Sequence, residues 1–459
     1  MRRLSPVAWL VSDDIRWEEV LLAGSVLLYR AATGGGGNVY VSAAVCALFG
    51  LGLLRLLVRQ PLLDLASGPL LLLYAFIALD CVALFRAVQA GSVETATGAI
   101  TTSCATVLLV AVAVVSLQSA TSVREWRGRL LAILCAPSVD VAANVVLHLA
   151  HVQSPGAVAA ASQQETTATM LGLVGIHTTR VLFPLSQGVN AFGGIAGLAL
   201  AISLVGLRLL TGPARKLAGL SSMVTLYALL AVDSRDGLFF ALAAAALVLM
   251  ATRISTRGAG FAPLFLPVAP SAVLGGLGLV SSLGLAAGLS RSGGDNVATA
   301  TGRSAIWQVV LDFLTQHPAL KQLVGYGAYG HVTSEVSYSY AYVYQGYVDP
   351  QNNPAQNFLL QTVLDTGYVG AAIAVALLSV ALLLAARRVR GRSRDPLFVA
   401  TLAGLLFLGL LGVLEASPMI YNTDAFGAFL LLVVSAIVVP AGLAVDSRSR
   451  APVGSARLV

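Results

Sequence analysis

Long apolar stretches separated by short polar ones dominate the pattern along the chain. Two of them, LLLLYAFIAL (residues 70–79) and FLLLVVSAIVVPAGLAV (residues 429–445), carry no charged side chain. A helix needs about 20 apolar residues to cross the hydrocarbon core of a bilayer, and it satisfies its own backbone polar groups, which lipid cannot do. The pattern therefore predicts an all-α, polytopic membrane protein.

The same pattern, followed along the whole chain, predicts about twelve transmembrane helices. Their expected ranges are 18–31, 39–58, 66–86, 97–117, 128–150, 190–210, 216–232, 236–252, 262–289, 357–387, 396–415 and 424–444. Most connections are short, but two outer segments, residues 151–189 and 290–356, are long. Loops of that length are usually functional or disordered.

These boundaries divide the chain into three expected parts. Residues 1–215 form an N-terminal transmembrane bundle, and residues 216–387 form a core that includes the larger outer loop. Residues 388–459 form a C-terminal pair of spans and a cytoplasmic tail.

The amino-acid composition excludes a soluble domain. Of 459 residues, 57% are hydrophobic and 11% are charged, whereas about a quarter of a soluble domain is charged. The first residues, MRRLSPVAWLVSDDIRWEEV, are charged and lack a small-residue cleavage site, so we expect this segment to stay attached. The four cysteines fall inside expected spans without a C-x-x-C pair, which indicates no disulfide or metal framework.

The distribution of basic residues predicts the orientation in the membrane. With the N-terminus in the cytoplasm, 21 of the 28 lysines and arginines lie on the cytoplasmic side, as the positive-inside rule requires. We therefore expect a multi-pass protein of the cytoplasmic (inner) membrane with both termini in the cytoplasm. The net charge of +7 mostly reflects this topology, so it does not indicate a nucleic-acid partner.

The basic residues on the outer side are exceptions to this rule, and each needs a reason. Arg30 and Arg86 flank spans, and we expect their side chains to extend to the lipid headgroups. Arg235 lies in AVDSRDGLFF, a tight turn between two spans. It could form a local salt bridge with the neighbouring aspartates, or it could clamp an anion, since the planar guanidinium matches phosphate oxygens.

The larger outer loop contains two recognisable features. RSAIWQVVLDFLTQHPAL begins at Arg303 and keeps a helical apolar spacing, which predicts an amphipathic helix on the membrane surface with Trp307 as an interfacial anchor. The glycines of LVGYGAYGH then permit a tight loop. The tyrosine-rich stretch that follows could contact carbohydrate or lipid, or simply pack at the interface.

The stretch PAQNFLLQTVLDTGYVG (residues 354–370) opens a span with polar side chains. Gln356, Asn357 and Asp365 are expected to form a polar wall of an outward-facing cavity, since buried acids in membranes are usually functional or paired. Asp80 and Asp140 also lie within expected spans. They could line a proton or substrate path, or they could form hydrogen bonds deep in the bundle.

The order of these motifs resembles the O-antigen ligase/polymerase superfamily, membrane glycosyltransferases of the Wzy/WaaL type. The matching order is DSRDG between two spans, R-x-x-x-W, G-Y-G-x-x-G and QNFLLQTVLDTGYVG, and it covers about residues 216–387. A weaker similarity lies in TTRVLFPLSQGVN, where Arg180, Phe183 and Asn190 fit the family's loop before the sixth span.

The resemblance implies a GT-C-like fold and a transfer reaction on the outer face that needs no metal or other cofactor. The donor would be a glycan on undecaprenyl or decaprenyl diphosphate, and the acceptor a hydroxyl of a glycan or lipid, in the synthesis of a cell-envelope polysaccharide. The family's arginines hold the diphosphate, a role that falls on Arg235 and Arg303 and less directly on Arg180. In agreement, the outer side shows no D-x-D motif and no cluster with metal-ligand spacing.

The chain departs from the family at one position, because Gln356 stands where the family usually has a histidine. That histidine is the proposed activator of the acceptor hydroxyl, and glutamine cannot take a proton. Gln356 could orient the acceptor while another group acts as the base. The candidates are His331, Glu335 and Asp365.

The expected site therefore has two sets of residues. The catalytic set is Arg235, Arg303, Gln356, His331 and Asp365. The substrate-binding set is Arg180, Asn190, Ser234, Trp307, Lys321, Tyr326, Glu335 and Asn357.

Two other functions remain as alternatives. A transporter of lipid-linked oligosaccharide or polysaccharide would typically show internal repeats and broken helices, and the two halves of this chain show no convincing repeat. A peptidoglycan polymerase of the shape, elongation, division and sporulation type would need an acidic catalytic motif in a large outer loop, and none matches.

The predicted topology can be tested at Ser339, which lies in the larger outer loop. In a variant without native cysteines, Ser339→Cys should react with a membrane-impermeant thiol reagent added to intact cells, because the charge distribution places this loop outside. Labelling only after permeabilisation would reverse the topology.

Overall fold

The structure is a computed structural model, which describes most of the chain with gaps. The described residues are 17–33, 39–59, 68–91, 96–120, 122–152, 169–172, 175–176, 178–186, 189–254, 303–344, 352–391, 395–416 and 425–438.

The described residues form an all-helical protein, as the sequence predicted. The longer helices are α2 (Trp17–Thr33), α3 (Val39–Arg59), α4 (Gly68–Gln89), α5 (Ala96–Gln118), α6 (Val123–Leu149), α9 (Val189–Leu209), α10 (Gly212–Val232), α11 (Arg235–Ile254), α17 (Phe358–Gly391), α18 (Pro396–Leu414) and α19 (Ala425–Val438). The shorter ones are α8 (Thr169–Gly172), α13 (Arg303–Gln316), α14 (Ala319–Val324), α15 (Gly330–Thr333), α16 (Val336–Tyr340) and the 3₁₀ helix η4 (Ala341–Tyr344).

Within the described residues, eight helices are long and apolar enough to cross a membrane: α3, α4, α5, α6, α9, α10, α17 and α18. Three more of the expected spans are also helical, namely α2, α11 and α19. The expected span at 262–289 lies outside the described residues. The membrane class is therefore confirmed, and the number twelve stays a prediction.

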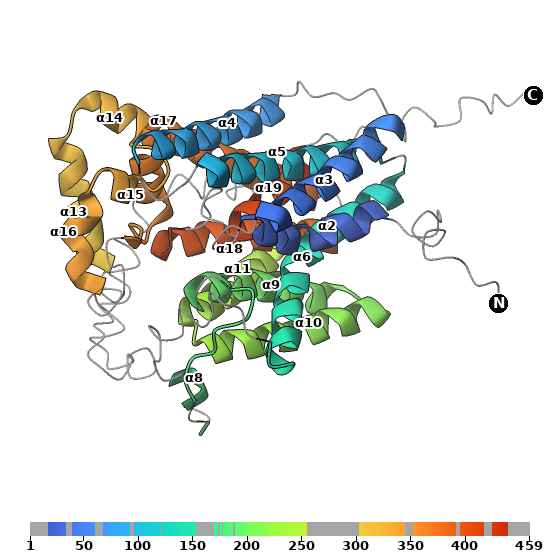
Figure 1. Cartoon of the computed structure of the whole chain (residues 1–459). Coiled ribbons are helices and arrows are strands. Elements are labelled where there is room, and N and C mark those ends of the chain that lie inside the picture. Colours follow the sequence, from blue (N-terminus) through green and yellow to red (C-terminus); the bar gives the residue numbers. More distant parts are fainter. Residues whose placement is uncertain are drawn as a thin grey trace, which may run out of the picture.

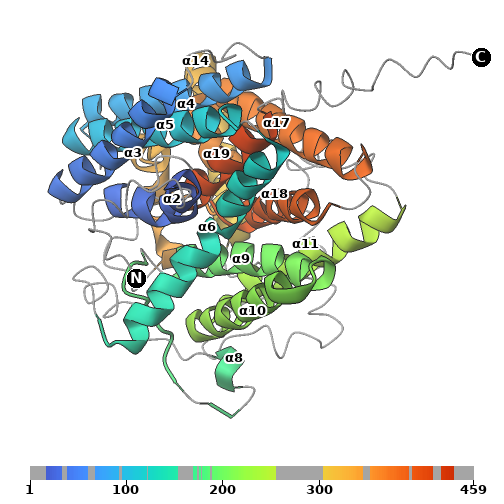
Figure 2. The same cartoon turned by 90° about the vertical axis from the view of Figure 1, so that its right-hand side faces the viewer.

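The long helices form a bundle, and four short helices gather at one end of it. Figure 1 shows α13, α14, α15 and α16 together at the left end of the long helices. Viewed from the side in Figure 2, α9, α10 and α11 form one flank, and α3, α4 and α5 form the opposite flank. Helix α18 is mostly buried and packs against α9, α11 and α17, and α17 in turn packs against α4, so α18 and α17 together connect the two flanks.

Glycines allow α9 and the start of α11 to approach closely. A Cβ atom added at Gly193 would lie 2.3 Å from the Ser234 side chain, and one added at Gly237 would lie 2.6 Å from the Gly193 carbonyl oxygen. Gly193 and Gly197 have the spacing of the small-residue motif through which membrane helices pack. This close contact fixes the DSRDG turn against α9.

The glycine loop between α14 and α15 enters a break in α17. Gly367 interrupts the helix with a φ of 72°, and a Cβ atom there would meet the Leu323 backbone at 2.2 Å. The loop backbone bonds to both neighbouring helices, because Tyr326 N donates to Leu364 O and Ala328 N donates to Ala83 O of α4. A side chain at position 367 would therefore displace the loop.

Arg86 does not extend to lipid headgroups, so that expectation was wrong. Its guanidinium donates to the carbonyls of Val324 and Gly325, at 2.7 Å each. The end of α4 thus holds the glycine loop in place, so a protein contact accounts for this basic residue without a lipid contact.

The expectation for Arg30 was also wrong, because this residue is buried between α2 and α6. Its Nη2 atom lies 2.8 Å from the Asp140 carboxylate, and its Nη1 donates to Leu185 O. Asn144 Oδ1 accepts from the Leu185 N–H. For Asp140 the structure thus shows the interhelical pair that we considered as the alternative to a transport path.

Removing one member of the Arg30–Asp140 pair should destabilise the protein. Asp140→Ala leaves a buried guanidinium without its partner, which typically costs about 3–5 kcal/mol. We expect a clearly lower thermal unfolding temperature in detergent for Asp140→Ala, and partial recovery in the double variant Arg30→Met/Asp140→Leu, which buries no charge. A double variant less stable than Asp140→Ala would show that the pair is not what stabilises this contact.

Candidate active site

The DSRDG turn presents one carboxylate to the end of the bundle that carries the short helices. Asp233 caps α10 in the left-handed conformation, which turns the chain sharply into α11. The buried Ser234 hydroxyl and the Gly237 N–H both donate to Asp236 Oδ1, at 3.0 Å each. These two bonds hold the carboxylate of Asp236 so that its other oxygen, Oδ2, faces α13.

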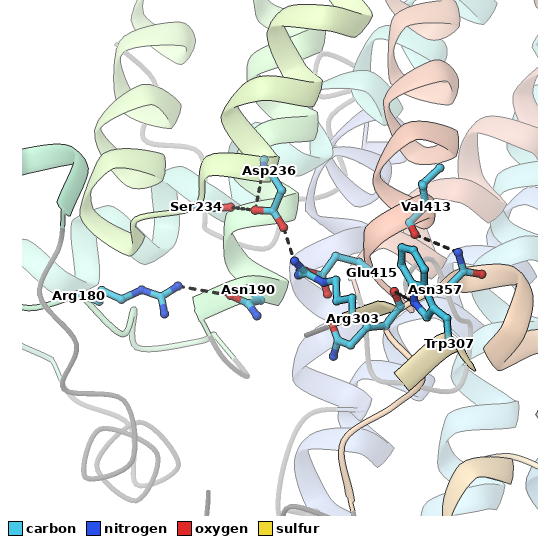
Figure 3. Close-up of polar contacts among 11 residues, drawn as sticks. Arg180, Asn190, Ser234, Asp236, Arg303, Trp307, Asn357, Val413 and Glu415 are labelled. Atoms are coloured by element: carbon cyan, nitrogen blue, oxygen red, sulfur yellow. Dashed lines mark hydrogen bonds and ion pairs between the residues drawn. The ribbon is translucent and has the colours of Figure 1, made fainter. Parts of the chain in front are cut away.

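Arg303 occupies the space between Asp236 and Glu415. Its Nη2 atom lies 2.5 Å from Glu415 Oε1 and 3.6 Å from Asp236 Oδ2. Figure 3 shows the three side chains meeting where α11, α13 and the end of α18 converge. Each is partly exposed: 15% of the Arg303 side chain, 13% of Glu415 and 23% of Asp236. We call this group of three side chains the Arg303 cluster.

Arg180 and Asn190 lie on the other side of the DSRDG turn. Arg180 Nε donates to Val232 O at 2.8 Å, and its Nη2 donates to Asn190 Oδ1 at 3.3 Å. Asn190 is exposed and Arg180 is half-buried. The two side chains and the Arg303 cluster thus flank the same turn (Figure 3).

Arg235 shows the local ion pair that we considered for it. Its Nη2 lies 3.6 Å from Asp233 Oδ2, and Asp233 Oδ1 also accepts from the Met170 N–H of α8. Its aspartate partner is Asp233, whereas Asp236 turns to Arg303. The guanidinium of Arg235 is 15% exposed, so a second role in anion binding stays a prediction.

Trp307 is not an interfacial anchor, which corrects the prediction for α13. Only 5% of Trp307 is exposed, and its Nε1 donates to Gln356 O at 3.1 Å. The helix was predicted correctly, but its apolar face, with Ile306 and Val310, packs against residues of α16 and α17. The face therefore binds protein instead of lipid and fixes Arg303 at the start of the helix.

Asn357 holds the start of α17 next to the end of α18. Its Oδ1 accepts from Leu360 N at 3.0 Å, and its Nδ2 donates to Val413 O at 2.9 Å. It is 2% exposed, so the structure gives it a positioning role two residues from Glu415. Gln356, just before it, has a φ of 50° and is half-buried.

His331 and Asp365 form a separate buried network. Gln361 Nε2 lies 2.9 Å from both His331 Nδ1 and Asp365 Oδ1, and Gly330 N donates to the same carboxylate oxygen at 2.6 Å. Since the amide donates to Nδ1, His331 carries its proton on Nε2, which faces Asn352 O at 3.2 Å. Burial lowers the pKa of His331 to about 4, so the imidazole is neutral at physiological pH.

The remaining predicted residues lie on the short helices. Lys321 is exposed on α14 and lies over the Tyr326 ring at 5.3 Å from its centroid, and Glu335 is exposed between α15 and α16. Both views show α14 on the α4 side of the molecule and α11 on the other flank (Figures 1 and 2). Helix α14, which carries Lys321, therefore lies apart from α11, which carries Asp236 of the Arg303 cluster.

Sequence reasoning missed three residues that organise these groups: Asp236, Glu415 and Gln361. Asp236 had been considered only as a salt-bridge partner for Arg235. Glu415 carried a usable signal, because it is an acid directly after an apolar span on the predicted outer side. Gln361 gave none, since its role depends on the loop that packs against α17.

Comparison with protein families gives a match to the central part of the chain. Residues 220–375 match the family model described as O-antigen ligase (Wzy_C), and no curated protein matches the chain. The matched region includes the DSRDG turn, the described helices α13 to α16 and the first half of α17, whereas Arg180 and Glu415 lie outside it. Residues 220–375 thus resemble an O-antigen ligase domain, and this match supports the predicted similarity of this membrane protein to the O-antigen ligase/polymerase superfamily.

Proposed function

We propose that this protein is a membrane glycosyltransferase that transfers a glycan from polyprenyl diphosphate to a hydroxyl of a glycan or lipid. The reaction takes place on the outer face of the cytoplasmic membrane, with twelve spans and both termini inside. It serves as the polymerisation or ligation step of a cell-surface polysaccharide. The match to an O-antigen ligase model supports this proposal and gives no support to the transporter alternative.

The observation that carries the proposal is the placement of Arg303. Its guanidinium is partly exposed and is held by two carboxylates at the junction of α11, α13 and α18. When the glycosyl bond breaks, the diphosphate leaves with the bonding electrons and gains negative charge. A guanidinium fixed in place before the reaction stabilises that charge without reorganisation, so no metal ion is needed for this role.

The neighbouring groups extend the same proposal. Arg180 and Asn190 flank the turn from the other side, and we assign them to the diphosphate or the first sugar, together with Ser234 and Arg235. Gln356 orients the acceptor beside Trp307. The exposed residues Lys321 and Glu335 and the half-buried Tyr326 contact more distant sugars, because the short helices lie at the end where a glycan would extend.

Removing the guanidinium at position 303 should abolish transfer. Arg303→Ala is expected to reduce the rate by at least about 100-fold, the usual effect of losing one donor to a developing anion. Arg303→Lys should recover only part, because an ammonium lacks the planar fork. The measurement is transfer from a lipid-diphosphate glycan by purified protein in liposomes.

Two further variants complete that experiment. Arg235→Ala should also lose transfer, whereas Arg215→Ala, which removes an exposed arginine of α10, should keep it. Full activity of Arg303→Ala would exclude this residue from the site and refute the proposal as stated.

The buried environment of His331 should make stability depend on pH. An unfolded histidine has a pKa near 6.5, and burial lowers it to about 4 in the folded protein. The unfolded state therefore binds more protons between these values, so the stabilisation is complete above about pH 6.5 and is lost as the pH falls towards 4.

We expect the unfolding temperature of the wild type to fall more steeply from pH 6.5 to 4.5 than that of His331→Gln. His151→Asn, which replaces an exposed imidazole, should keep the wild-type slope. If His331→Gln has the same slope as the wild type, the imidazole titrates as in the unfolded chain. His331 could then act as the base near neutral pH.

A further inference from the structure

The Arg303 cluster has more acidic than basic groups. If Asp236 and Glu415 are both ionised, the three side chains sum to a charge of −1, and an anionic diphosphate meets a negatively charged site. If one carboxyl group carries a proton, the sum is zero. The neutral acid then also offers an O–H donor, which a carboxylate lacks. Anion binding at Arg303 therefore favours a protonated carboxyl group.

The surroundings of the two acids indicate which one takes the proton. Asp236 Oδ1 accepts from the Ser234 hydroxyl and the Gly237 N–H, and such donors favour the ionised form. Glu415 is the cap residue after α18, where the helix carries partial negative charge that disfavours an anion. Arg303 Nη2 lies closer to Glu415 Oε1, at 2.5 Å, than to Asp236 Oδ2, at 3.6 Å, but only Asp236 accepts from two further donors. A proton taken up by this pair of acids therefore goes to Glu415, and Asp236 stays ionised.

The charged groups around Glu415 agree with this assignment. Burial raises the pKa of Glu415 to about 8; Arg303 of α13 opposes the shift, and Asp236 of α11 adds to it. Tyr344 of η4 also interacts electrostatically with Arg303. At pH 7 the Glu415 carboxyl group is therefore mostly protonated.

We infer that Glu415 is a further diphosphate-binding residue that acts as a neutral acid, donating its O–H to a phosphate oxygen beside the Arg303 guanidinium. This inference rests on the proposed function. Binding of the diphosphate donor therefore requires a proton on Glu415, and the affinity of the site for diphosphate falls when Glu415 ionises. Glutamine at this position keeps the shape and a neutral N–H donor, so it should replace glutamate in binding.

The test measures binding of farnesyl diphosphate, a short prenyl diphosphate, to the purified full-length protein in detergent at pH 7 and pH 9. For the wild type we expect about tenfold weaker binding at pH 9, because the protonated fraction of Glu415 falls about tenfold across this range. Glu415→Gln should bind at pH 9 as tightly as at pH 7, with an affinity close to that of the wild type at pH 7. Asp312→Asn makes the same chemical change at an exposed acid of α13 and should keep the wild-type pH dependence.

A second measurement on the wild type avoids any folding defect of the variant. Calorimetric titrations at pH 9 in two buffers of different ionisation enthalpy should show uptake of about one proton per ligand. No proton uptake, or loss of binding in folded Glu415→Gln at pH 7, would overturn the inference while leaving the proposed function intact. Failure of the wild type to bind at either pH would overturn both.

Discussion

The packing of α11, α13 and α18 at the end of the bundle that carries the short helices depends on the neutralisation of one largely buried arginine. Arg303 begins α13, and its guanidinium contacts Glu415 at the end of α18 and Asp236 at the start of α11. An arginine does not lose its proton in a protein, so this largely buried charge is costly unless acidic side chains pair with it. Three elements far apart in the sequence are thereby fixed at one point, and that point is where the proposed reaction occurs.

The other contacts of this region can be understood as support for that point. The Trp307 indole binds the Gln356 carbonyl, and the Asn357 side chain bonds to both Leu360 and Val413. These bonds connect α13 to the start of α17, and the start of α17 to the end of α18. On the opposite flank, the close packing of Gly193 and Gly237 holds the DSRDG turn against α9. Small residues and buried amides thus set the position of the charged groups.

Much of the fold followed from the sequence, because hydrophobic length and charge asymmetry are local properties. The spans at α3 to α6, α9, α10, α17 and α18 were all anticipated, and the helix at Arg303 was too. Its surroundings were not, because an amphipathic face looks the same whether it binds lipid or protein. Trp307 and Arg30 show the same limit: both were assigned to the membrane surface, and both have protein partners that are distant in the sequence.

The candidate site could be predicted only in part, because sequence patterns show local properties and not contacts between distant residues. The motifs identified Arg303, Arg180 and Asn190, but Glu415 lies 112 residues from Arg303 and outside the matched region. Gln356, which stands where the family usually has a histidine, indicated that the base must be another residue. No local pattern, however, could show that His331 is buried between Gln361 and Asn352. Residues that come into contact only in the folded bundle have no fixed spacing in the sequence, so no sequence motif identifies them.

The contacts of the glycine loop have a consequence for how the chain can vary. Backbone hydrogen bonds join Tyr326 to Leu364 and Ala328 to Ala83, and the Arg86 guanidinium donates hydrogen bonds to the carbonyls of Val324 and Gly325. These partners lie on two long helices, Leu364 on α17 and both Ala83 and Arg86 on α4, so an inserted or deleted residue here would break several of these bonds at once. Insertions and deletions should accordingly be excluded from residues 324–330 and tolerated at the exposed positions of α16. The exposed residues of the short helices can therefore vary while the length of this loop stays constant.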